Sequence, residues 1–426
     1  MTYSSIAFRS LKYEPKRYLL LFLVASLGIA MALSAIGLMN GILNAFNNKA
    51  RIYYGGDLML IHSTNGRLGW YNTEETLDLI EPYFSSKNFL ISSRIDYENK
   101  ETYLFFEGES LKQRKIKGVD FNKEEKLFST LTFLDGSRKI QKGTNGIYIS
   151  TVTAEKLKLN IGDNVLLMLK TVNNYTETAN LVVEGIFQDS SLFGANVSYL
   201  DLEFLRNLVN YPKDYSISIG IFTNKKLTTS EICSIQNDLN KIFDMYEIVE
   251  DKQFFIDALN TAKGKTALIT LTANLENLNF LILAMHIIIY IIIAVLILII
   301  AIGIGSTYKV IAVKRTNEIG MYMALGLSPK GIIKLFLIEV FYLISGAFIF
   351  SLLILLIITV AIKSLDFTLI PAFDIFLMDG KLLIHPSFLQ IISIFVIVVV
   401  TTMILVYFTI RKCVKIEPVD ALSVTE

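Results

Sequence analysis

The segment FLILAMHIIIYIIIAVLILIIAIGIG, Phe280 to Gly305, contains one side chain that titrates near neutral pH, His286. A helix needs about 20 apolar residues to cross the hydrocarbon core of a bilayer. Three more segments meet that length: Tyr18–Met39, Leu335–Ile362 and Phe388–Ile410. Hydrophobic residues make up 53% of the 426 residues and the mean hydropathy is +0.50. We therefore predict an α-helical membrane protein with four transmembrane helices, because a soluble protein rarely averages so high.

The basic residues beside these segments predict the orientation. Tyr18–Met39 is longer than the apolar region of a secretory signal, so we expect it to be a retained membrane anchor. Lysines and arginines gather in three short flanks, and basic flanks stay in the cytoplasm. They are Lys12, Lys16, Arg17; Lys309, Lys314, Arg315, Lys330, Lys334; and Arg411, Lys412, Lys415. Both termini and the loop between the second and third spans are thus expected inside.

The expected organisation is one span, a large outer domain, and three spans. The cytoplasmic segments are 1–17, 306–334 and 411–426; the spans are 18–40, 280–305, 335–362 and 388–410; the outer parts are 41–279 and 363–387. Cys233 and Cys413 then lie on opposite sides and cannot pair. The formal net charge of +1 carries no information for a chain divided in this way.

Residues 41–279 change to short apolar alternations separated by turn residues, which predicts a mixed α+β domain in two lobes. Thr73 to Phe84 reads as a helix with Thr73 as N-cap, and Arg94 to Gly108 as a hairpin turning at Glu98 to Lys100. Gly162 to Lys170 and Thr178 to Phe187 read as an antiparallel pair, and Thr228 to Asp244 as an amphipathic helix. Lys252 to Asn279 is helix-compatible and predicts a helical stalk.

Further predicted elements are the strands at 55–63, 115–121, 145–150, 197–201 and 215–222 and helices at 151–159 and 202–209. No catalytic pattern stands out. Gly264-Lys265-Thr266 ends like a phosphate loop, but Leu259 stands where that loop needs glycine. His62, His286 and His385 have no carboxylate or thiol at ligand spacing, so we expect no metal, no cofactor and no catalytic residue on this chain.

The charged stretch KRTNEIGMYMALGLSPKGI, Lys314 to Ile332, lies between two spans. A solvated cytoplasmic loop is the plain interpretation. Its apolar positions Ile319, Tyr322, Met323 and Leu325 instead fit an amphipathic helix that seeks a partner or the lipid interface. Gly326 is placed to end that helix, and Ser328 with Pro329 to begin the next.

This stretch resembles the signature of ABC-transporter permeases of the FtsX/MacB/lipoprotein-releasing type, R-T-x-E-I-G-x-x-x-A-L-G followed by F-L-x-E. The matching residues are Arg315, Thr316, Glu318, Ile319, Gly320, Ala324, Leu325, Gly326 and Glu339. Met323 stands where the family commonly has arginine. The order of spans also matches, as do outer landmarks at Gly56, Asp57, Gly118, Asp120, Gly162, Asp163 and Gly185 and the tail IEPVDALSVTE.

The resemblance implies that Lys314 to Gly326 is a coupling helix seated on a cytoplasmic ABC ATPase dimer that binds ATP and Mg. No Walker A loop occurs in these 426 residues, so the ATPase is expected on another chain. A second permease chain, identical or paralogous, would complete the transporter in a bacterial inner membrane, with the large domain in the periplasm. No nucleic acid partner is implied.

The resemblance favours extraction of lipoproteins toward a periplasmic carrier, with MacB-like efflux or FtsX-like activation of cell-wall hydrolases as the alternative. The connection TVNNYTETA, 171–179, lacks the long proline-containing hook of one lipoprotein-releasing permease. A membrane-anchored sensor or scaffold is the rival from another class. For Glu339, one turn inside the third span, we expect an anchoring role rather than a proton or substrate path, the plain alternative being contact with Lys330 or Lys334.

Overall fold

The computed structural model describes residues 3–13, 15–64, 67–189, 191, 193–258, 263–365, 367, 370, 373–378 and 380–414. The tail resemblance at 416–426 lies outside these residues. The chain forms two compact units. The first, here called the membrane unit, comprises 1–41, 283–365 and 382–426; the second, the sheet unit, comprises 42–282 and 366–381.

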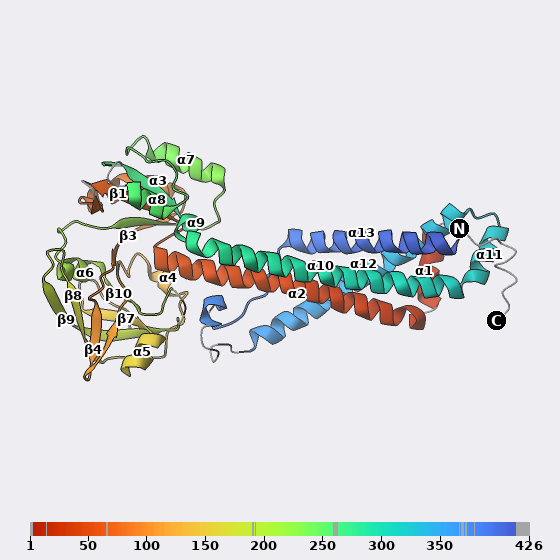
Figure 1. The fold of residues 1–426 in the computed structure, drawn as a ribbon, viewed down its shortest axis with the longest axis horizontal. Helices are drawn as coiled ribbons and strands as arrows, with labels where there is room; N and C mark the ends of the chain where they lie inside the picture. Colours follow the sequence, from red (N-terminus) through yellow and green to blue (C-terminus); the bar gives the residue numbers. More distant parts are fainter. Residues whose placement is uncertain are drawn as a thin grey trace. The chain divides into compact units, whose positions relative to one another are not determined.

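The membrane unit is built from long helices (Figure 1). Its helices are α1 (Tyr3–Tyr13), α2 (Pro15–Tyr54), α10 (Glu276–Lys314), α11 (Thr316–Ala324), α12 (Pro329–Lys363) and α13 (Phe388–Cys413); α2 and α10 contribute their remaining residues to the sheet unit. Four helices of the described residues are long and apolar enough to span a membrane: Tyr18–Tyr54, Glu276–Lys314, Pro329–Lys363 and Phe388–Lys412. The four predicted spans lie within them.

Small residues let these helices approach closely, as is usual where lipid removes the hydrophobic drive for association. A Cβ on Gly28 would lie 2.6 Å from the side chain of Ile300, and one on Gly41 only 1.8 Å from the carbonyl oxygen of Leu383. The core of the unit is aliphatic, with Ile29, Leu33 and Val340 fully buried.

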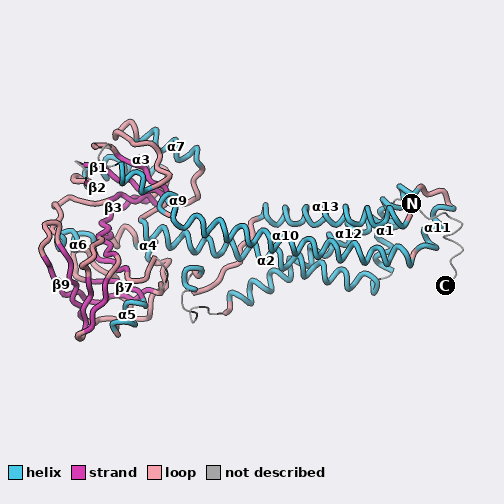
Figure 2. The backbone as a smooth tube through the Cα atoms, viewed as in Figure 1, coloured by secondary structure: helices cyan, strands magenta, loops and turns pink. Residues whose placement is uncertain are grey.

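The sheet unit contains one mixed sheet, drawn in magenta in Figure 2. Its strand order is β12-β1-β11-β3-β6-β10-β7-β9-β8-β4-β5, with β2 beside β1. The strands are β1 (Leu58–Thr64), β2 (Arg67–Leu68), β3 (Leu90–Tyr97), β4 (Tyr103–Phe106), β5 (Glu109–Lys112), β6 (Lys115–Val119), β7 (Gly146–Ser150), β8 (Asn164–Lys170), β9 (Thr176–Phe187), β10 (Val197–Asp201), β11 (Ser218–Phe222) and β12 (Thr266–Thr270).

Short helices accompany the sheet: α3 (Thr73–Ser86), α4 (Glu125–Phe128), α5 (Thr151–Leu157), α6 (Leu202–Val209), α7 (Thr229–Leu239), α8 (Lys252–Asp257), α9 (Leu271–Asn274) and the 3-10 turn η2 (Phe373–Phe376). Separate apolar clusters lie under the two halves of the sheet, one around Leu167 and Leu200 and another around Leu60 and Phe84. The α+β class is confirmed.

Several local predictions are confirmed, and three are wrong. The strands β8 and β9 pair antiparallel as predicted. The predicted hairpin at Arg94 to Gly108 does not form, because β3 pairs with β11 and β6 whereas β4 pairs with β5 and β8.

The predicted stalk at Lys252 to Asn279 instead contains α8, strand β12 and α9 before α10 begins. Strand β12 pairs with β1, about two hundred residues earlier in the chain, and that distant partner outweighs the local helical preference. At α3 the N-cap is Asn72, not Thr73, whose hydroxyl bonds to the carbonyl oxygens of Trp70 and Asp214.

Candidate coupling site

The predicted stop and restart around the charged stretch are confirmed. Helix α10 ends at Lys314 because Arg315 leaves helical geometry, with φ −101° and ψ 18°. Helix α11 ends before Gly326, whose φ of +89° lies in the left-handed region that glycine adopts without strain. Ser328 then caps α12 by accepting a 3.2 Å hydrogen bond from the amide of Gly331.

One face of α11 is buried within the membrane unit. Ile319 is 5% exposed and belongs to the aliphatic core of that unit, and Gly320 is buried beside it. Met323 and Leu327 pack against the same core while partly exposed. The apolar positions that were expected to face a partner therefore lie on two sides of α11. Ile319 packs into the membrane unit itself, whereas Leu325 is exposed.

The opposite face of α11 is exposed. The exposed residues are Asn317, Met321 and Ala324 on α11, with Lys314 at the end of α10 and Leu325 directly after α11; these five residues are here called the docking stripe. Met321 is 51% exposed and Leu325 is 77% exposed. Two large apolar side chains four residues apart, with a lysine at one end, suit an apolar groove with acidic surroundings on a partner.

Arg315 does not belong to this stripe, because its guanidinium points inward. Nη1 lies 3.2 Å from both carboxylate oxygens of Glu339, and Nε donates a 2.7 Å hydrogen bond to Glu318. The group also lies over the ring of Phe336, 5.2 Å from its centroid. Arg315 is 5% exposed, so it fixes the position of α11 rather than facing solvent.

The buried carboxylate of Glu339, on α12, contacts residues of α1, of α2 and of the junction between α10 and α11. Its Oε1 accepts 2.6 Å hydrogen bonds from Ser10 of α1 and from the hydroxyl of Tyr18 on α2. Together with Arg315 this satisfies a side chain that is 1% exposed. Lys334 is not its partner, since that ammonium lies 5.4 Å from the centroid of the Tyr3 ring.

The guanidinium of Arg315 stays protonated. Burial alone would lower the pKa of its guanidinium, but the carboxylates of Glu339 and Glu318 raise it above its ordinary value. The pair is thus a charged, hydrogen-bonded connection between the junction of α10 with α11 and the base of α12.

Sequence reasoning did not identify Ser10, Tyr18, Asn317 or Met321. The last two could have been found by placing α11 on a helical wheel opposite Ile319. Ser10 and Tyr18 carry no comparable signal, because their partner Glu339 lies more than 300 residues away.

The outer landmarks shape turns rather than a binding site. Gly56, at φ +132°, lets the chain turn from α2 into β1, and a Cβ there would lie 2.6 Å from the carbonyl oxygen of Ile221. Asp57 follows, pairing with Arg51 at 2.8 Å and accepting hydrogen bonds from the amide and hydroxyl of Thr223. This corner therefore ties the end of α2 to β11.

The remaining landmarks are also structural. Asp120 accepts from the amides of Asn122 and Lys123, Gly162 has φ +93°, and Asp163 accepts from the amide of Asn160 at 2.7 Å. A Cβ on Gly118 would press on Leu205 at 3.1 Å, and one on Gly185 would meet the ring of Tyr148 at 2.8 Å.

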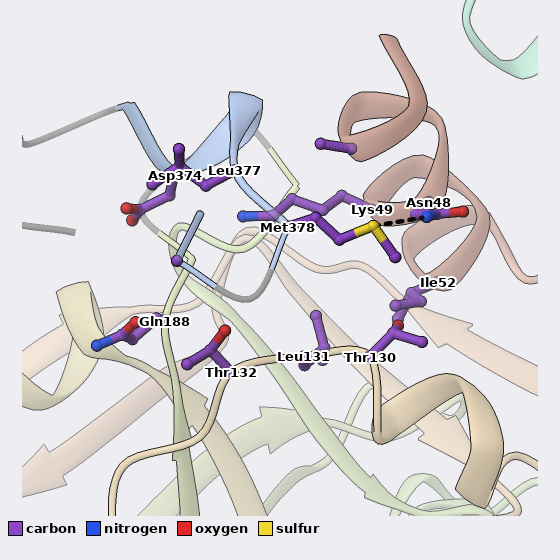
Figure 3. A pocket seen from close by; sticks show the side chains of 12 residues that line it. Asn48, Lys49, Ile52, Thr130, Leu131, Thr132, Gln188, Asp374, Leu377 and Met378 are labelled. Carbon is purple, nitrogen blue, oxygen red and sulfur yellow. Dashed lines mark hydrogen bonds between the residues drawn. The ribbon is translucent and has the colours of Figure 1, made fainter. Parts of the chain in front are cut away.

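Two cavities lie within the described residues of the sheet unit. Figure 3 shows a small one between the end of α2 and η2, where Asn48 Nδ2 lies 3.7 Å from Met378 Sδ. Lys49, which also lines it, has its ammonium 3.6 Å from the carboxylate of Asp189. A wider, open hollow lies along α5, beside Asp135, Glu155 and Lys158. No group of histidine, cysteine or carboxylate residues that could hold a metal ion occurs among the described residues.

The membrane unit thus belongs to a multi-pass membrane protein whose short helix α11 is fixed on one face and exposed on the other. Residues 290–418 match the family model of the FtsX-like permease C-terminal domain. The resemblance noted in the sequence is therefore confirmed for this part of the chain, which is similar to the C-terminal domain of FtsX-like permeases.

A solved structure, the periplasmic region of MacB from Actinobacillus actinomycetemcomitans, matches with 11% identity and a TM-score of 0.33, over 53% of this chain and 94% of that one. No curated protein matches the sequence.

Proposed function

We propose that this permease couples ATP binding and hydrolysis, by a cytoplasmic ABC ATPase dimer on separate polypeptides, to movement of its sheet unit. The chain itself is then non-catalytic, and ATP with Mg is bound by the partner. The observation that carries this proposal is the division of α11 into a face buried in its own core and the exposed docking stripe. A solvated loop would need neither a buried ion pair nor exposed Met321 and Leu325.

The proposed orientation places α11 and both termini in the cytoplasm of a bacterium and the sheet unit in the periplasm. Basic residues support it: Lys314 ends α10, and Arg411 and Lys412 lie in the last turn of α13. A second permease chain, a copy or a paralogue, would supply the other coupling helix.

For the substrate we propose lipoproteins extracted from the inner membrane, with MacB-like or FtsX-like mechanotransmission as the alternative. The resemblance of the signature and the span order supports the first choice. The turn between β8 and β9 spans only Thr171 to Tyr175, so a periplasmic carrier would not be gripped through a long hook at this place. This chain would then be the partner permease without the hook.

The docking proposal is tested by replacing Met321 and Leu325 with aspartate in the tagged full-length chain, extracted from native membranes. Loss of two central apolar contacts should weaken ATPase association at least 30-fold, which is the effect of a hot spot of about 2 kcal/mol. The matched control is Ile242→Asp, since Ile242 is similarly exposed, at 40%, in the sheet unit.

A protein with a Walker A loop that copurifies with the control and not with the double variant supports the coupling function. Undiminished recovery with the double variant contradicts it, and absence of any ATPase from the parent favours the sensor or scaffold. Acylated proteins enriched with a catalytically trapped ATPase would support lipoprotein extraction; their absence, with the ATPase retained, would favour mechanotransmission.

A further inference from the structure

Helix α1 lies where an interfacial helix would lie. It ends at Tyr13, and α2 begins at Pro15, three residues before the apolar span starts at Tyr18. Within the membrane unit, α1 runs across the long axis of the spanning helices, at the end where the N-terminus lies (Figure 1). If the long helices span a bilayer, a helix that crosses their axis beside the start of a span would run parallel to the membrane plane, at the level of the lipid headgroups.

The inner face of α1 is held by the unit itself. Ser10 donates to Glu339, and Ser4 and Tyr342 share a 2.6 Å hydrogen bond between their hydroxyls. Ala7 is 1% exposed, and Leu11 packs against the aliphatic core. These contacts fix the rotation of α1 about its axis and therefore decide which residues face away.

The outer face of α1 carries Ser5, Phe8, Arg9, Lys12 and Tyr13, and Lys16 is exposed at the start of α2. Phe8 is 59% exposed and Tyr13 is 77% exposed. No acidic side chain belongs to this face among the described residues. Aromatic rings interleaved with cations match a bilayer surface, where rings enter the headgroup layer and cations meet phosphates.

We propose that this face of α1 binds anionic phospholipid headgroups of the leaflet beside the docking stripe. The charge complementarity with three cations and the position at the start of a span favour lipid over a protein partner. Each cation near an anionic membrane surface contributes about a fivefold gain in affinity. The inference goes beyond the coupling function, requiring only that the unit span a membrane.

The test places a reporter on this face with Phe8→Trp in the full chain, reconstituted in nanodiscs of phosphatidylcholine and phosphatidylglycerol. Either the first or the second lipid is brominated, so that quenching of the new tryptophan reports which lipid contacts position 8. The chain contains one native tryptophan, Trp70, and the signal of the parent chain is subtracted for it.

We expect stronger quenching by brominated phosphatidylglycerol, and loss of that preference in 0.5 M salt. Replacing Arg9, Lys12 and Lys16 together by glutamine should lower the preference at least fivefold. The matched control replaces Arg67, Lys112 and Lys226, three exposed cations of the sheet unit, by glutamine and should retain the preference.

Equal quenching of the Phe8→Trp chain by the two brominated lipids overturns the proposal. This result does not depend on the triple glutamine variant, so misfolding of that variant cannot obscure it. Absence of quenching by either lipid also overturns it, because the ring would then lie outside the bilayer. If the tryptophan at position 8 becomes shielded from solvent only when an ATPase is added, the face would be assigned to a protein partner instead.

Discussion

Replacing Glu339 by glutamine should release α11 from the base of α12. Glutamine has nearly the same shape and can still accept hydrogen bonds from Ser10 and Tyr18, so packing is preserved. The buried guanidinium of Arg315, however, loses its counter-charge at 3.2 Å. Breaking a buried ion pair by removing one partner costs about 3–5 kcal/mol. The lower figure applies here, because Glu318 remains 2.7 Å from Arg315.

If α11 opens as a unit, a cost of about 3 kcal/mol raises the exchange rates of its amide hydrogens on the order of 100-fold. Hydrogen exchange read by mass spectrometry, on the full chain in nanodiscs, measures this for peptides that cover Thr316 to Ala324. Peptides of α13 serve as the internal reference, and their exchange should not change.

The matched control is Glu318→Gln, the same chemical change at the other carboxylate that contacts Arg315. Glu318 has a side chain 41% exposed, and exposed pairs contribute about 0–1 kcal/mol, so the effect should stay below about fivefold. Equal effects of the two substitutions would refute the argument from burial. Unchanged protection of α11 in the Glu339 variant would refute the anchoring role itself.

Three predictions concern the sheet unit and are read from the fluorescence of buried Trp70 during chemical unfolding of the full chain. Glu124→Gln should cost about 3–5 kcal/mol, because Arg94, 1% exposed, would lose the carboxylate that it contacts through Nε and Nη2; a loss below 1 kcal/mol would contradict this. Gly220→Ala should cost about 1–3 kcal/mol, since its Cβ would lie 1.8 Å from the carbonyl oxygen of Gly55, and an unchanged midpoint would show that the strand yields freely. Burial lowers the pKa of Lys117 from 10.5 to about 7, although the carboxylate of Asp96 opposes this shift. The unfolded chain therefore binds more protons than the folded chain above pH 7, and the free energy of unfolding should rise toward pH 10 by at most about 1.4 kcal/mol per pH unit. Lys117→Met should flatten this rise, and a free energy of unfolding that falls over the same pH range would contradict the prediction.

Features that depend on neighbouring residues could be predicted from the sequence. Gly326 ends α11 and Ser328 with Pro329 begins α12, because capping depends on backbone geometry within one turn. The pair β8 and β9 could be predicted for the same reason, since a short turn joins its strands.

Features that depend on contacts with distant residues could not be predicted from the sequence. Strand β3 lies between β11 and β6, so the polar turn after it does not make a hairpin. The segment around Thr266 to Thr270 became a strand because β1 offers it an edge. Which face of α11 is exposed likewise follows from Ile319 fitting the core of the membrane unit, and periodicity alone gives the two faces without saying which is covered.

The buried carboxylate of Glu339 connects α11 mechanically to the base of α12. Ser10, Tyr18 and Arg315 bring α1, α2 and the start of α11 to one point on α12. A displacement of α11 must either break the ion pair or carry the base of α12 with it. Separation leaves a charge buried without a partner, whereas joint movement keeps every hydrogen bond. The second course costs less, so we infer that force applied to the docking stripe reaches α12 through Arg315 and Glu339, and that lipid held by α1 would resist the same movement.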